Sequence, residues 1–262
     1  MSEHKFPTEI IDLPSQGKVY SQDNPLSKGS IEIKYMTARE EDILASQNLI
    51  RKGVVLDKLF ESVIVDKDVN IDDIIIGDKN AILLATRILG YGADYKVEVT
   101  DPFTLEQQKV TVDLSKVQTK EIDFNLLNSE NKYEFELPTA KKKVVLKLLS
   151  HKDEKDINAE VQALQRLSKD QDKISSDLST RLRYLIVEVD GKTDRGYINN
   201  YVRNELLARD SRAIRNYIQE ITPDVDLRFD FTSNLTGESE ALDIPMGAGF
   251  FYPTDWLLNP TS

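Results

Sequence analysis

No cysteine occurs in this chain of 262 residues, and histidine and tryptophan are scarce, with two and one respectively. The lack of cysteine excludes disulfides, thiolate metal sites and cysteine catalysis. His4 and His151 lie far apart in the sequence, and such a pair without cysteine does not match the usual zinc ligand sets. The first residues contain no apolar run typical of a signal peptide, and no stretch approaches the ~20 apolar residues of a membrane span. We therefore expect synthesis in the cytoplasm.

Sequence motifs for catalysis are also missing. No glycine-rich loop follows a predicted strand as in a P-loop or a dinucleotide fingerprint, and no Gly-x-Ser-x-Gly elbow is present. Asp68, Asp72 and Asp78 suggest a cation site, but their segment lacks the ligand spacing and the central glycine of a calcium loop. We interpret these carboxylates as helix caps. The sequence thus predicts neither enzyme activity nor a cofactor or metal, and the alternative is a cation-dependent hydrolase built on these acidic residues.

The charge balance argues against a polyanionic partner. Asp and Glu total 45 against 34 Lys and Arg, which gives a net charge of −11 at pH 7. The resulting field repels phosphate groups, so we expect neither nucleic acid nor membrane as a partner. Lys141–Lys143 is the only tight basic run, and we interpret it as a solvated strand entry.

Four arginines would form one basic stripe on the predicted helices of the second half. They are Arg203, Arg209, Arg212 and Arg215. Such a stripe is either a docking surface for an acidic partner or a set of ion pairs with acids of the same chain, and we favour the second interpretation. His151 falls at a predicted helix start, where we expect an exposed side chain.

Two segments of the chain have the same pattern. Residues 77–114 and 209–246 align without a gap, and each predicts a helix, an acidic break, a strand, a polar turn and a second strand. Aligned identical residues include Asp78 with Asp210, Ala81 with Ala213, Ile82 with Ile214, Asp94 with Asp226, Thr100 with Thr232, and Glu106 with Glu238.

The similarity extends toward the start of each half. A strand pattern at 30–36 is followed by the spacing of a capping box, and a similar strand pattern at 143–149 is followed by a related pair. The pairs are Thr37 with Glu40 and Ser150 with Asp153. The first pair predicts one helix that ends at Gly53. Between the halves, 121–127 and 132–138 predict two further strands.

We therefore predict an α+β fold of two tandem related repeats, each a strand, a helical layer and a β-hairpin. The predicted parts are an extended N-terminal arm (1–29), a first repeat (30–118), connecting strands (119–142), a second repeat (143–246) and an aromatic C-terminal tail (247–262). The arm could contact its own body or a neighbour. Because the arm and the tail are not duplicated, we expect partner contacts there. The candidate partner-binding residues are Leu13, Tyr20, Phe250, Phe251, Tyr252, Trp256, Leu257 and Leu258.

Five sequence strings have a familiar form. They are DLPSQGKVY, IEIKYMTAREEDIL, NLIRKGVVLDKL, IGDKNAILLATRILGYG and LLARDSRAIRNYI. Together they resemble the T4-type bacteriophage baseplate hub subunit family, also described as baseplate hub assembly proteins. Some members of that family carry cysteine pairs in the turns that correspond to 101–108 and 233–240, which would form zinc-knuckle tips. Here these turns contain no cysteine, so the resemblance implies no metal site.

The resemblance implies a non-enzymatic component or assembly factor of the baseplate hub of a contractile-tailed phage, acting through protein–protein contacts. Its partners would be other baseplate, hub or tail proteins, and its location the virion tail baseplate and, during assembly, the host cytoplasm. The alternative is a transient chaperone of the tape-measure protein or of another hub protein, absent from the mature virion.

Overall fold

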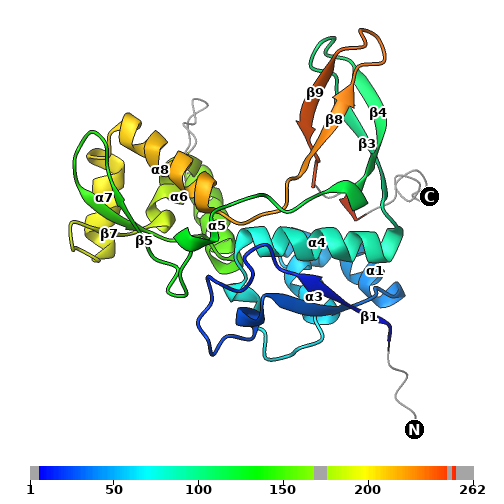
Figure 1. Cartoon of the computed structure of the whole chain (residues 1–262), viewed down its shortest axis with the longest axis horizontal. Coiled ribbons are helices and arrows are strands. Elements are labelled where there is room, and N and C mark those ends of the chain that lie inside the picture. Colours follow the sequence, from blue (N-terminus) through cyan, green and yellow to red (C-terminus); the bar gives the residue numbers. More distant parts are fainter. Residues whose placement is uncertain (1–5, 168–175, 247–249, 252–262) are drawn as a thin grey trace.

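The computed structural model describes residues 6–167, 176–246 and 250–251. It combines helices with small antiparallel sheets (Figure 1), which confirms the predicted mixed α+β class. Over these residues, none of the helices has both the length and the apolar character required to cross a bilayer.

The N-terminal half begins with two paired strands and ends in a hairpin. Its strands are β1 (Thr8–Asp12), β2 (Ser30–Lys34), β3 (Asp94–Thr100) and β4 (Gln107–Asp113). Its α-helices are α1 (Ala38–Ala45), α2 (Gln47–Lys52), α3 (Val55–Val63) and α4 (Ile76–Tyr91). Three short 3-10 helices complete it, η1 (Pro25–Lys28), η2 (Ile71–Asp73) and η3 (Leu114–Lys116).

Within the residues that the structure describes, the C-terminal half has a three-stranded sheet, four α-helices and a second hairpin. Its strands are β5 (Tyr133–Glu136), β6 (Lys143–Leu146), β7 (Ile186–Val189), β8 (Arg228–Thr232) and β9 (Ser239–Asp243). Its α-helices are α5 (His151–Leu167), α6 (Asp177–Leu185), α7 (Arg195–Asn204) and α8 (Ala208–Ile221). The sheets pair as β1–β2, β3–β4, β5–β6–β7 and β8–β9.

One of the two strands predicted between the halves is wrong. Residues 132–138 contain β5, as expected, but 121–127 contain the 3-10 helix η4 (Phe124–Leu126). The Asp123 carboxylate accepts the backbone N–H of Asn125 at 2.9 Å. Such a local side-chain bond competes with strand pairing, and the alternating pattern of the segment does not overcome it.

Residues 6–29 are packed on the chain's own body. Strand β1 pairs with β2, and beyond it the N–H of Leu13 donates to the carbonyl of Gly29 at 2.9 Å. The buried apolar side chains of this segment include Leu13, Val19, Tyr20 and Leu26. The described part of the predicted arm is therefore a portion of the folded core and not a free extension.

The predicted capping box is present at the start of α1. The N–H of Thr37 donates to Glu40 at 2.8 Å, and its hydroxyl donates to the same carboxylate at 2.6 Å. The predicted single helix is wrong, because the backbone turns to φ −69° and ψ 102° at Ser46 and divides it into α1 and α2. The end of α2 at Gly53, with φ +70°, agrees with the prediction.

Helix α4 lies between the two halves and contacts both (Figure 1). Just before it, Ile75 pairs with Ser150 in an isolated bridge, and the N–H of Ile76 donates to the carbonyl of Leu149 at 3.0 Å. Within α4, the side-chain amide of Asn80 donates to the carboxylate of Asp224, in the segment before β8, at 3.1 Å. Helix α4 is therefore one structural link between the N-terminal and C-terminal halves.

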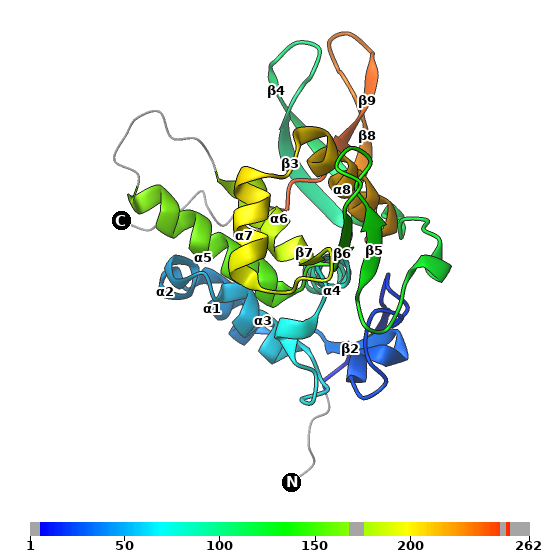
Figure 2. The ribbon, with the colours of Figure 1, turned by 90° about the vertical axis from the view of Figure 1, so that its left-hand side faces the viewer.

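The two hairpins stand side by side and extend away from the helices, as Figures 1 and 2 show. Strands β3 and β4 pair over seven residues and β8 and β9 over five, both antiparallel as the sequence predicts. At their bases the Tyr95 hydroxyl donates to the carbonyl of Pro245 at 2.9 Å. The Phe250 ring packs edge-on against Tyr95 at 5.2 Å between ring centres, which closes the apolar contact between the hairpins.

Candidate functional site

The turn between β3 and β4 is organised by Asp101. Its Oδ1 atom accepts the backbone N–H of Phe103 at 2.8 Å and of Thr104 at 3.3 Å. The N–H of Asp101 donates to the carbonyl of Glu106, and the N–H of Leu105 donates to the carbonyl of Asp101, both at 2.8 Å. Aspartate forms such turns because its short side chain reaches N–H groups two and three residues further along the chain.

The turn between β8 and β9 has the same hydrogen bonds around Ser233. The Ser233 hydroxyl accepts the N–H of Leu235 and of Thr236, both at 3.2 Å. The N–H of Ser233 donates to the carbonyl of Glu238 at 2.8 Å, and the N–H of Gly237 donates to the carbonyl of Ser233 at 2.9 Å. The two turns therefore have matching backbone geometry.

Side chains join the two turns directly. The Ser233 hydroxyl and the Gln108 amide nitrogen both donate to Oδ2 of Asp101 at 2.6 Å, and the N–H of Asn234 donates to Oε1 of Gln108 at 3.2 Å. Burial raises the pKa of Asp101, but the bonds from Ser233 and from the turn N–H groups outweigh it and leave this pKa below its ordinary value. An ionised carboxylate with four donors thus holds the hairpins together at their tips.

Large apolar side chains are exposed at the joined tips. Leu105 is 79% exposed, Leu235 63% and Phe103 38%, and we call these three residues the hairpin tip surface. Leu105 has φ +62°, a left-handed conformation that costs a leucine about 1 kcal/mol, whereas the matching position of the other turn is Gly237 with φ +75°. Exposure and strain at Leu105 do not stabilise the fold. The hairpin tip surface is therefore the candidate functional site.

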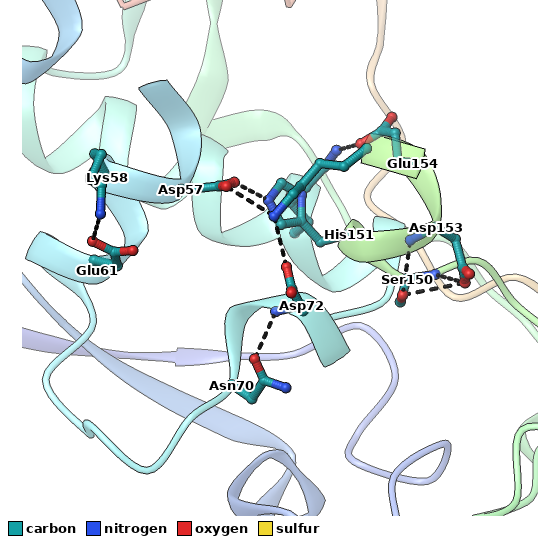
Figure 3. Close-up of polar contacts among 11 residues, drawn as sticks. Asp57, Lys58, Glu61, Asn70, Asp72, Ser150, His151, Asp153 and Glu154 are labelled. Atoms are coloured by element: carbon teal, nitrogen blue, oxygen red, sulfur yellow. Dashed lines mark hydrogen bonds and ion pairs between the residues drawn. The ribbon is translucent and has the colours of Figure 1, made fainter. Parts of the chain in front are cut away.

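A polar cluster lies between the halves, where α5 meets α3 and η2 (Figure 3). The Nε2 atom of His151 is 2.6 Å from Oδ1 of Asp57, and the Lys155 ammonium is 2.9 Å from Oδ2 of the same residue. Lys155 is also 2.9 Å from Asp72. Burial raises the pKa of Asp57, but the hydrogen bonds from His151 and Lys155 outweigh it, so this pKa is below its ordinary value.

The His151 ring in this cluster is buried, which makes the prediction of an exposed side chain wrong. Its edge faces Phe60 at 5.8 Å between ring centres, and the start of α5 packs on α3 there. A His–Asp pair can orient a general base, but the second ring nitrogen, Nδ1, has no hydrogen-bond partner in the described part of the chain. The geometry supports a structural link between the halves, together with the adjacent ion pair of Lys79 and Glu154.

Two of the carboxylates interpreted as helix caps, Asp72 and Asp78, have other roles. Asp78 is the third residue of α4 and not its cap. Its carboxylate accepts the N–H and hydroxyl of Ser15 at 2.9 and 2.6 Å and the hydroxyl of Tyr20 at 2.6 Å. Burial raises the pKa of Asp78 more than these bonds lower it. Asp72 forms an ion pair with Lys155. Among the residues that the structure describes, no three histidine or acidic side chains lie close enough together to hold a metal ion.

The predicted partner-binding residues divide into two sets. Leu13, Tyr20, Phe250 and Phe251 are at most 6% exposed and belong to the chain's own core. These four are therefore not available to a partner on the folded chain, because their apolar surface is already covered. Tyr252, Trp256, Leu257 and Leu258 lie outside the described residues.

Sequence reasoning did not single out the hairpin tip surface. The available signal was the presence of Phe103, Leu105 and Leu235 in two otherwise polar turns. A groove of about 550 Å³ opens between the hairpins nearer their bases, with Thr111 and Asp113 of β4 on one wall.

Comparison with protein-family models, with curated proteins and with solved structures finds no match to this chain.

Proposed function

We propose that this protein is a non-enzymatic component or assembly factor of the baseplate hub of a contractile-tailed phage, and that it docks other tail proteins through the hairpin tip surface. The observation that carries the docking role is the exposure of Leu105 and Leu235 on two turns fixed by Asp101. Apolar side chains on turns whose backbone is already fixed bind a partner with less loss of backbone conformational entropy. The phage context comes from the family resemblance of the sequence.

We also propose that the two halves are tandem repeats. Asp78 accepts bonds from Ser15, and Asp210, its aligned counterpart, accepts the N–H of Thr139 and of Ala140 at 2.7 and 3.0 Å. Both acceptors are near the start of a helix, and both donors follow a strand and a Leu-Pro pair. The proposed repeat therefore includes part of segment 6–29, which matches β5 and the turn after it.

The capping residues support the same proposal. Lys34 contacts the Glu40 carboxylate at 2.8 Å, and Lys147 contacts Asp153 at 2.7 Å. Each lysine lies three residues before the hydroxyl residue of its helix start. A duplicated frame of this kind brings two related hairpins together, which gives the joined tips that the docking role requires.

Complementation in the phage that encodes this chain tests the docking role. We expect Leu105→Ser with Leu235→Ser to reduce the yield of complete baseplates while the melting temperature stays within about 2 °C of the wild type, because both side chains are exposed. The matched control is Leu126→Ser with Leu178→Ser, two leucines 41% and 46% exposed elsewhere on the chain, which should leave the yield unchanged. Normal assembly with both tip leucines replaced would refute the docking role.

Mass spectrometry of purified virions separates the two forms of the proposal. Presence at a fixed copy number supports a structural subunit. Absence from the virion, together with retention of tape-measure protein by the wild type and loss of that retention in the tip variant, supports a transient chaperone. A protein that is absent from virions and dispensable for tails would contradict both.

A further inference from the structure

The tertiary structure gathers two basic segments that are far apart in the sequence. The Asp210 carboxylate near the start of α8 holds the backbone of Thr139 and Ala140, so the turn before Lys141–Lys143 lies against this helix. Lys142 extends the contact, since its ammonium is 3.6 Å from Glu205 in the α7–α8 junction and 4.6 Å from the centre of the Tyr201 ring.

The stripe of arginines lies at the same junction. Arg203 is in the last turn of α7, and Arg209, Arg212 and Arg215 follow one another at helical spacing on α8. All four side chains are exposed, and no hydrogen bond or salt bridge joins them to another described residue. Arg209 nevertheless acts on its neighbour Asp210: burial raises the pKa of Asp210, while the N–H groups of Thr139 and Ala140 and the charge of Arg209 lower it. Intrachain pairing of these arginines in the described structure is therefore limited to this effect of Arg209 on Asp210.

An exposed leucine lies among these charges. Leu207, between Arg203 and Arg209, is 46% exposed. We define the basic surface as Lys141, Lys142, Arg203, Leu207, Arg209 and Arg212. Like charges at neighbouring helix positions destabilise a helix slightly. The protein has a net charge of −11, so this cluster of basic residues is also opposite in sign to the chain as a whole. A stabilising role in the fold therefore does not explain the cluster.

We propose that the basic surface is a second docking site, distinct from the hairpin tips, and that it binds an acidic segment of a partner protein that also supplies an apolar side chain to Leu207. Carboxylates on the partner would complement the exposed guanidinium groups. A protein partner fits better than nucleic acid for two reasons. The overall negative charge repels a long polyanion, and an exposed leucine contributes to a contact with apolar side chains but not to one with phosphate.

The test uses the full chain and a labelled synthetic helical peptide with glutamates on one face and leucines beside them. Fluorescence anisotropy should show binding that weakens as salt is added. Arg209→Glu with Arg212→Glu should weaken it by about tenfold or more, because two attractive contacts become repulsive. The control Lys96→Glu with Lys109→Glu makes the same change in net charge at exposed positions of β3 and β4 and should have less than about a twofold effect.

Leu207→Ser separates the two kinds of partner. We expect it to weaken peptide binding about threefold or more and to leave the binding of single-stranded DNA unchanged. Equal weakening by the two charge-reversal pairs would overturn the proposal, since only net charge would then matter. Tighter binding of DNA than of the peptide, with no effect of Leu207→Ser on either, would overturn it in favour of a nucleic-acid site. Circular dichroism of each variant checks that the fold is intact.

Discussion

Replacing Gly77 in α4 by alanine should weaken the link between the halves. A Cβ atom at Gly77 would lie 1.8 Å from the carbonyl oxygen of Pro223 and 2.9 Å from the Cα atom of Asp224. Ordinary contact needs about 3.5 Å, and both obstacles are backbone atoms, so α4 and the segment before β8 must move apart. Overpacking of this kind costs about 3 kcal/mol, and the better helix propensity of alanine offsets about 0.5–1 kcal/mol. We expect a net loss of about 2 kcal/mol in the free energy of unfolding.

Gly90, in the last turns of the same helix, provides the matched control. Its added Cβ would meet Met36, at 2.1 Å from the Cε atom, but that atom is the free end of a flexible side chain and can rotate away. Gly90→Ala should therefore change stability by less than about 0.5 kcal/mol, because the gain in helix propensity offsets the repacking. Urea denaturation followed by far-ultraviolet circular dichroism measures both variants at equal m-values. Equal costs for the two variants, or wild-type stability of Gly77→Ala, would refute the close approach of α4 to Pro223.

Three further substitutions test the buried carboxylates. Asp78→Ala leaves three buried donors without their acceptor and should lower the free energy of unfolding, measured by urea denaturation, by about 3–4 kcal/mol. The control Asp73→Ala, at an exposed position, should lower it by less than about 0.5 kcal/mol, and similar losses for the two variants would refute the role of Asp78. Glu40 has a pKa lowered to about 2 from 4.5, because the bonds from its lysine, serine and threonine partners outweigh the burial that raises it. The contribution of ionised Glu40 to the free energy of unfolding is present above pH 4.5 and is lost as the pH falls toward 2. The stability advantage of the wild type over Glu40→Gln should therefore shrink between pH 4.5 and 2, and an advantage independent of pH would contradict this. Asp101→Ala should speed amide exchange in both hairpin turns, including that of Ser233; protection unchanged in the second turn would show that the tips are not coupled.

Elements that depend on neighbouring residues could be predicted from the sequence. The two hairpins follow from strand alternation on either side of polar turns, and the first helix start follows from the spacing of Thr37 and Glu40. Each of these features is decided within a few residues. The same local patterns failed where a competing local bond was stronger, as at Asp123, and where the backbone turned at Ser46 without a proline or glycine to signal it.

The candidate site and the basic surface depended on contacts between distant segments. Asp101 and Ser233 are 132 residues apart, and only the folded chain brings their turns into hydrogen-bond contact. Burial of His151 likewise required α5 to pack on α3, since a helix start of this composition is normally exposed. Local sequence decides which elements form, because it sets backbone preferences. Tertiary packing decides which polar groups are buried and which arginines and leucines remain exposed, because both depend on surfaces that meet only after folding.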